Sequence, residues 1–215
     1  MYLKPSEQTD LEDTVNKLKR SDPLLAEVID QVGPCRFKRG TQGITALVSS
    51  IIEQQLSTSS AQAIRSRVET LFGNGGIRPE QFAEINDTEL QQTGLSRMKV
   101  SYLRSLADNV LNGKINFPEL ENMDDEAVVE TLCRVKGIGR WTAQMYLMFS
   151  LGRLDVFPVT DGALRAALKH VYGLPEATFD AEAGKIADRW RPFRSIACWY
   201  LYAQLDTYRS NKKKA

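Results

Sequence analysis

The sequence has little cysteine. It holds three cysteines in 215 residues, and Cys35, Cys133 and Cys198 are far apart and form no CxxC pair. This pattern favours neither a zinc site nor a disulfide framework. An iron–sulfur cluster held by four cysteines is not expected either, because the chain has too few thiols. We expect the three side chains to be buried as small apolar groups.

Long hydrophobic runs are also missing. No stretch approaches the roughly 18 apolar residues that cross a bilayer. Residues 1–15 are polar and acidic, unlike a secretory signal. We therefore expect no membrane partner, and a cytoplasmic or nucleoid-associated location (nuclear in a eukaryote) rather than secretion.

An excess of charge is absent too. The chain has 28 basic and 27 acidic residues, which give a net charge of +1. Proteins that coat nucleic acid non-specifically carry a clear positive excess, so composition alone argues mildly against a nucleic-acid partner.

What the sequence does have is helical periodicity. Apolar residues recur at helical spacing in residues 11–29, 45–55, 61–71, 97–112 and 124–132. No segment of strand length alternates between apolar and polar residues. The sequence therefore predicts an all-α fold.

The segment 132–143 predicts two helices joined by a tight hairpin. Gly137 and Gly139 allow the backbone to turn and remove side chains that would block a close approach, and Ile138 between them should pack inward. The N–H groups that begin the second helix can then bind a phosphate oxygen without much positive charge. Taken alone, this spacing is more typical of a tight helix–helix turn with no function.

Asp161 follows the second helix of this hairpin, in the segment 153–162. It directly precedes the apolar periodic residues 163–168. By itself, an aspartate at this position is interpreted as a helix N-cap.

The combination of these motifs resembles the helix-hairpin-helix DNA glycosylase superfamily. Within it, the segments 137–143 and 190–195 resemble the 3-methyladenine DNA glycosylase II branch, and the resemblance covers about residues 44–204. It implies two helical lobes with an active-site cleft between them. We expect residues 38–156 to form the lobe with the hairpin, and residues 1–37 and 157–215 to pair as the second lobe.

The resemblance also implies roles for individual residues. Asp161 matches the catalytic aspartate. The other matches are the substrate-pocket aromatics Trp141 and Tyr202, the DNA-binding residues Gly137, Gly139 and Thr142, the inserting segment with Gln54 and Gln55, and the main-chain carbonyls of Cys133, Val135 and Gly137 for a monovalent cation. Gln55 is the preferred inserting residue, with Gln54 and Leu56 as alternatives.

The chemistry implied is hydrolysis of an N-glycosidic bond. A carboxylate such as Asp161 stabilises the oxocarbenium-like sugar and orients the attacking water. An alkylated, cationic base leaves without a strong general acid, so the single histidine, His170, is expected at a helix end or on the surface.

Two departures from the family pattern matter. Close relatives often carry two acidic residues where this chain has Thr160 and Asp161, and relatives that also cut the strand have a lysine where this chain has Trp141. Without that amine no Schiff base forms, so no lyase activity is expected.

The sequence thus predicts a monomeric, monofunctional glycosylase that flips and excises alkylated bases from double-stranded DNA. Two alternatives stay open. One is a helix-hairpin-helix protein that binds DNA without chemistry. The other is a glycosylase for a different base, such as mispaired adenine or oxidised guanine. The preferred alkylated base is open as well.

Overall fold

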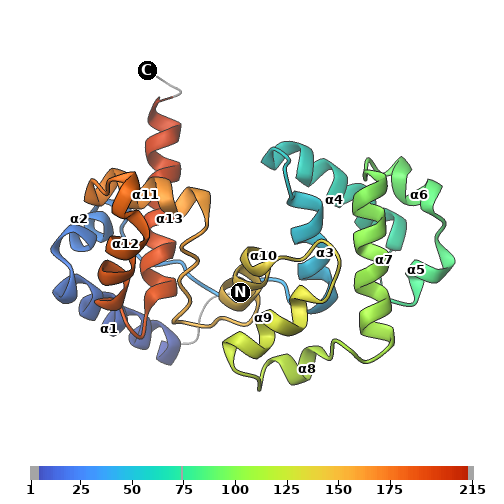
Figure 1. Ribbon diagram of the computed structural model, residues 1–215, viewed down its shortest axis with the longest axis horizontal. Coiled ribbons are helices and arrows are strands. Elements are labelled where there is room, and N and C mark those ends of the chain that lie inside the picture. The colour runs from blue at the N-terminus through green and yellow to red at the C-terminus, as the bar shows by residue number, and fades with distance from the viewer. Residues whose placement is uncertain (1–4, 74, 213–215) are drawn as a thin grey trace. The chain divides into compact units, whose positions relative to one another are not determined.

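The computed structural model describes residues 5–73 and 75–212, and every regular element within them is a helix (Figure 1). The all-α prediction is therefore confirmed. The chain forms two compact units, one from the residues up to Arg39 together with those from Gly152 onward, and one from Gly40 to Leu151. In the described part of the chain, no helix is both long and apolar enough to cross a membrane.

The unit that contains both ends of the chain is called here the terminal unit, and it is built around the last helix. Its helices are α1 (Pro5–Ser21), α2 (Pro23–Val32), α11 (Gly162–Tyr172), η2 (Glu176–Thr178), α12 (Phe179–Asp188) and α13 (Arg194–Lys212). α13, drawn in red in Figure 1, packs against α2 and α11, and α2 also packs against α1. The interior is apolar, with Leu25, Leu164, Leu168 and Leu201 fully or almost fully buried.

One buried carboxylate joins three parts of the terminal unit. Asp22 caps α2 by accepting a hydrogen bond from Leu25 N at 3.1 Å. Its other oxygen accepts hydrogen bonds from Tyr172 Oη and Trp190 Nε1, both at 3.0 Å. Because a buried carboxylate needs several donors, this arrangement explains why Trp190 is completely buried at the end of a polar segment.

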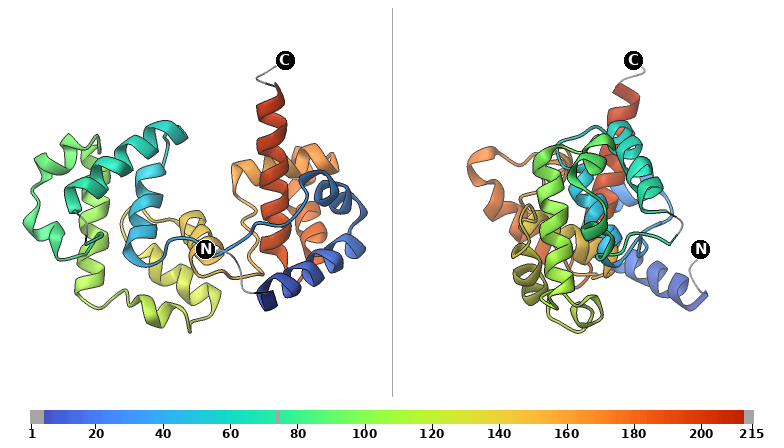
Figure 2. Two further views of the ribbon diagram at one scale, coloured as in Figure 1. Left: turned by 180° about the vertical axis from the view of Figure 1, so that it is seen from behind. Right: turned by 90° about the vertical axis from the view of Figure 1, so that its right-hand side faces the viewer.

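The second unit, called here the hairpin unit, contains the motif predicted from the glycines. Its helices are α3 (Gly43–Glu53), α4 (Thr58–Phe72), α5 (Gln81–Glu84), α6 (Asp87–Gln92), α7 (Arg97–Leu111), α8 (Phe117–Leu120), α9 (Asp125–Cys133), α10 (Arg140–Met145) and the π-helical turn η1 (Tyr146–Ser150). α3 packs against α4, α7 and η1, while α9 packs against α10. Figures 1 and 2 show α3, α4 and α7 from the front and from behind. The apolar residues of α3 and α7 supply the centre of this unit.

Short polar side chains begin several of these helices. Ser57 Oγ accepts from Ser60 N at the start of α4, and Asp124 Oδ1 accepts from Ala127 N at the start of α9. Each cap satisfies an N–H group that has no partner within the helix. The two caps thus fix where α4 and α9 begin.

The cysteines do not all behave as expected. Cys198 is buried, but Cys35 is partly exposed and Cys133 is exposed, so the expectation of three buried thiols was wrong. Cys133 is the last residue of α9 and lies off the buried stripe of that helix, which includes Leu132. His170 is exposed in the last turn of α11, as expected.

Candidate functional site

The hairpin between α9 and α10 depends on Gly137. This residue has φ +87°, and a Cβ at its position would overlap the ring of Tyr102 from α7. Ile138 is 4% exposed and packs inward, as predicted. Gly137 is therefore required both by backbone conformation and by close packing.

Gly139 has a different role. It is the N-cap of α10, with an extended backbone (φ −100°, ψ 176°) that any residue can adopt, and a Cβ there would meet nothing within 4 Å. No side chain caps α10. The fold itself does not need a glycine here, but the absence of a side chain leaves the start of the helix open to an anion.

The segment expected to insert into DNA forms a turn rather than the end of a helix. α3 stops at Glu53, two residues earlier than the apolar pattern suggested, and Leu56 N donates to Glu53 O at 3.2 Å across the turn. Gln54 leaves the helical conformation with ψ 126°, and Gln55 then adopts φ +57°. Gln54 turns inward and its Nε2 donates to Gly137 O at 2.9 Å, whereas Gln55 and Leu56 are exposed.

These residues surround one cavity of about 700 Å³ within the hairpin unit. It is lined by Ser50, Glu53, Gln54, Gln55, Tyr102, Gly137, Gly139, Trp141, Thr142, Met145, Tyr146, Phe149 and Ser150. Trp141 is 42% exposed and Thr142 is buried. The structure thus brings the following predicted residues together around one cavity: Gln54, Gln55, Gly137, Gly139, Trp141 and Thr142.

The sequence missed Tyr102 and Phe149 as cavity residues. Tyr102 lies in α7 beside the apolar residue Leu103, and nothing in the periodicity of that helix distinguishes it. Its packing against Gly137 is a contact between distant parts of the sequence, so only the fold shows it.

Asp161 lies in the terminal unit, as the N-cap of α11. It is 8% exposed, and its Oδ1 accepts a hydrogen bond from Leu164 N at 2.6 Å. Its backbone is fixed as well, because Asp161 N donates to Pro158 O at 2.8 Å and Arg165 N donates to Asp161 O at 2.9 Å. The carboxylate is therefore anchored at the positive end of a helix dipole.

Tyr202 lies near Asp161 in the same unit. Burial raises the pKa of the Tyr202 phenol, and the neighbouring Cys198 and Asp161 add to the effect. The hydroxyl oxygen is buried, and it lies close enough to the carboxylate to interact electrostatically but outside hydrogen-bonding geometry. The structure thus brings two of the predicted site residues together here.

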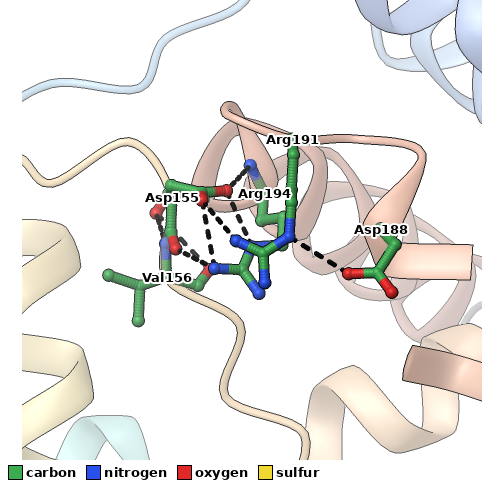
Figure 3. A network of polar contacts seen from close by, with 6 residues as sticks. Asp155, Val156, Asp188, Arg191 and Arg194 are labelled. Carbon is green, nitrogen blue, oxygen red and sulfur yellow. Dashed lines mark hydrogen bonds and ion pairs between the residues drawn. The ribbon is translucent and has the colours of Figure 1, made fainter. Parts of the chain in front are cut away.

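The chain leading to Asp161 is held by an ion-pair network (Figure 3). Asp155 accepts hydrogen bonds from Arg194 Nε at 2.7 Å and from Arg191 Nη1 at 3.0 Å. Ser195 Oγ accepts from Val156 N at 3.0 Å. This network explains the polar part of the 190–195 segment. Residues 38–39 and 152–156, which we expected in the lobe with the hairpin, belong to the terminal unit.

A charged pair lies at the start of α10. Arg140 makes two hydrogen bonds of 2.7 Å to the Glu126 carboxylate, one from each terminal nitrogen. Both side chains are more than half exposed. The Arg140 guanidinium holds the pKa of the Glu126 carboxyl below its usual range.

The carbonyls proposed for a monovalent cation are partly engaged. Val135 O accepts from Ile138 N at 3.0 Å, and Gly137 O accepts from Gln54 Nε2 at 2.9 Å. A carbonyl oxygen has two lone pairs and can accept a second contact. The loop with the Cys133, Val135 and Gly137 carbonyls is therefore compatible with a cation, which stays a prediction.

Comparison with known proteins identifies the family. The model of the HhH-GPD superfamily of base excision DNA repair proteins matches residues 48–192, which is more than half of the chain. The chain belongs to the HhH-GPD superfamily of base excision DNA repair proteins, and the family predicted from the sequence motifs is confirmed.

Individual relatives agree with this assignment. The chain is 29% identical over 202 residues to the alkylbase DNA glycosidase-like protein mag2 of Schizosaccharomyces pombe, covering 92% of this chain and 95% of that protein. It is 31% identical over 180 residues to DNA-3-methyladenine glycosylase 1 of the same yeast, covering 83% and 79%. The crystal structure of a DNA-3-methyladenine glycosidase from Bacillus halodurans matches with a TM-score of 0.81 at 38% identity, covering 92% of this chain and 91% of that one.

Proposed function

We propose that this protein is a monofunctional DNA glycosylase that acts as a monomer and excises alkylated bases from double-stranded DNA. The three relatives compared above are named as glycosylases or glycosidases of 3-methyladenine or of alkylated bases. The observation that carries the proposal is the buried, anchored carboxylate of Asp161 in a chain of the base excision repair family.

In the proposed reaction, the bond between the sugar C1′ and the base nitrogen breaks and the base leaves with the electron pair. The positive charge that develops on the sugar is stabilised by the Asp161 carboxylate. Water then adds to C1′ and gives up a proton, for which the carboxylate is the acceptor. The hydrogen bond from Leu164 N keeps the carboxylate in place during these steps, so little reorganisation is needed.

DNA binding is assigned to the hairpin unit. We propose that the open N-terminus of α10 after Gly139 receives a backbone phosphate. Gln55, exposed at the tip of its turn, inserts where the damaged nucleotide leaves the stack. Trp141, half-exposed in the cavity wall, offers an aromatic face to an electron-poor base.

The absence of lyase activity is part of the proposal. The family position that carries a lysine in strand-cutting enzymes is occupied here by Trp141, whose indole cannot form a Schiff base. Abasic sites left after base release should therefore stay uncut until alkali or another enzyme cleaves them.

Substitution of Asp161 by Asn tests the proposed function. Asparagine caps a helix about as well as aspartate, so α11 should form and the melting temperature should change little. Single-turnover release of methylated bases should fall by roughly 10²–10³, because a preorganised charge is lost from the transition state. DNA affinity should persist or increase, since a carboxylate also repels phosphate.

A matched control is available in the hairpin unit. Asp124 caps α9 through the same kind of bond, Oδ1 to Ala127 N at 2.8 Å, so Asp124→Asn is the same chemical change at another cap. It should leave base release unchanged. If a folded Asp161→Asn protein releases methylated bases almost as fast as the parent, Asp161 is not the catalytic carboxylate. If the parent itself releases no methylated base, the protein binds DNA without chemistry.

A further inference from the structure

Lys99 is a buried lysine in the first turn of α7, and its ammonium contacts two backbone carbonyls. Its Nζ donates to Ile52 O at 2.6 Å and to Gln54 O at 2.8 Å. Burial lowers the pKa of this ammonium. Because lysines are rarely buried unless their charge is compensated, these two carbonyls account for its position.

The carbonyls that Lys99 contacts belong to the end of α3 and to the turn that follows it. The turn has Gln54 at φ −53°, ψ 126° and Gln55 at φ +57°, and it is closed by the bond from Leu56 N to Glu53 O. These values define a type II turn, whose third position favours Gly or Asn because its φ is positive. Gln55 is the only non-glycine residue with positive φ in residues 5–73 and 75–212, so a long side chain is kept where the backbone disfavours one.

The contact with Gln54 O selects the type of turn. Type I and type II turns differ in the orientation of the peptide between their two central residues, which flips the carbonyl of the first. In this turn that carbonyl is Gln54 O, and it points to the Lys99 ammonium. A flip to type I would break this charged hydrogen bond and would remove the positive φ of Gln55.

The turn is also fixed on its other side. The Gln54 side chain is bonded to Gly137 O of the hairpin, while Gln55 and Leu56 are exposed. The Gln54 side chain is therefore held by a contact within the protein, and the Gln55 side chain is the amide that projects from the fixed turn.

We propose that Lys99 is a positioning residue that locks the Gln54–Gln55 turn in the conformation that inserts Gln55 into DNA. The proposal rests on the proposed function, because it assigns a cause to the geometry of the inserting segment. A lysine that merely caps α3 would stabilise the fold, and its loss would not affect base flipping in a folded protein.

The test measures base flipping separately from excision. A duplex with mispaired 2-aminopurine reports flipping, because the fluorescence of this base rises when it leaves the stack. Lys99→Met removes both hydrogen bonds at similar side-chain length, and Lys99→Arg keeps the charge and the donors. Lys114→Met, at an exposed lysine after α7, controls for the loss of one positive charge.

In Lys99→Met, we expect the flipped fraction to fall by roughly 10- to 100-fold, the range expected for loss of a charged hydrogen bond. Affinity for undamaged duplex should match that of Lys114→Met, because the hairpin contacts are retained. Lys99→Arg should keep most of the flipping. Adding Gln55→Asn to Lys99→Met should restore part of it, since asparagine tolerates positive φ and keeps an amide.

A folded Lys99→Met protein that flips the base as well as the parent does would overturn the proposal. Failure of both Lys99→Met and Lys99→Arg to fold would also overturn it, because the lysine would then be a requirement of the fold alone. If the parent protein flips bases but releases no methylated base, the proposed function is contradicted and the role of Lys99 is not.

Discussion

Substitution of the two hairpin glycines should affect different properties, stability for Gly137 and DNA affinity for Gly139. Gly137→Ala places a Cβ at φ +87° and into the Tyr102 ring. The left-handed conformation costs an L-residue about 1–2 kcal/mol, and inserting an atom into a packed contact costs about 1–3 kcal/mol. The free energy of unfolding should therefore fall by about 2–5 kcal/mol in total.

Thermal unfolding followed by circular dichroism measures this loss. In a chain of this size each kcal/mol lowers the melting temperature by about 2–4 °C, so Gly137→Ala should melt roughly 4–20 °C below the parent. Repeating the substitution in a Tyr102→Ala background separates its two causes. With the ring removed, Gly137→Ala should cost only the conformational part, about 1–2 kcal/mol.

Gly139→Val is the contrasting variant. Its backbone is extended and its surroundings are open, so the melting temperature should stay close to that of the parent. Affinity for duplex DNA should nevertheless fall by roughly tenfold, equally for all sequences, and the dependence on salt should weaken by about one phosphate contact. Parental affinity in a folded Gly139→Val protein would show that the hairpin is only a structural turn, and a parental melting temperature for Gly137→Ala would refute the conformational argument.

Two further predictions concern charge. Glu126→Gln releases Arg140 from its exposed ion pair, so the affinity for DNA should rise a few-fold. Binding titrations should also show a steeper dependence of affinity on salt. Weaker binding of the variant would show instead that Glu126 orients the Arg140 guanidinium for DNA. Burial raises the pKa of the phenols of Tyr172, Tyr200 and Tyr202, so the folded protein keeps protons that the unfolded chain releases near pH 10. The free energy of unfolding should therefore fall as pH rises above about 10. Urea unfolding at increasing pH should show that this free energy falls less steeply in Tyr202→Phe than in the parent. An equally steep fall in both proteins would mean that the Tyr202 phenol titrates normally.

Local sequence signals were sufficient for several helices and for the hairpin. Apolar periodicity identified the helices in the segments 11–29, 45–55, 61–71, 97–112 and 124–132, and the short polar caps at residues 57 and 124 lie where their side chains satisfy the first N–H groups. Gly137 was informative because one of its two requirements is local, a positive φ between two helices. These features depend on neighbours within a few residues, which a sequence pattern can show.

The inserting turn could not be predicted in the same way. Glutamine is a good helix former, and the apolar run before Gln54 favours continuation of α3. The groups that fix the turn are distant in sequence: Lys99 is separated from Gln54 by 45 residues, and Gly137 by 83. The same holds for the ion-pair network before the N-cap of α11, where Asp155 and Arg194 are 39 residues apart.

Asp161 shows why a sequence could not separate a structural cap from a proposed catalyst. As an N-cap it needs one carboxylate oxygen held against Leu164 N, and as an electrostatic partner of a developing cation it needs a fixed negative charge. These requirements do not compete, because the capping bond is what fixes the negative charge in place, at the positive end of a helix dipole. The two interpretations therefore predict the same residue at the same position, and they differ only in what the charge does. Asparagine keeps the bond and removes the charge, so the Asp161→Asn protein separates the two contributions.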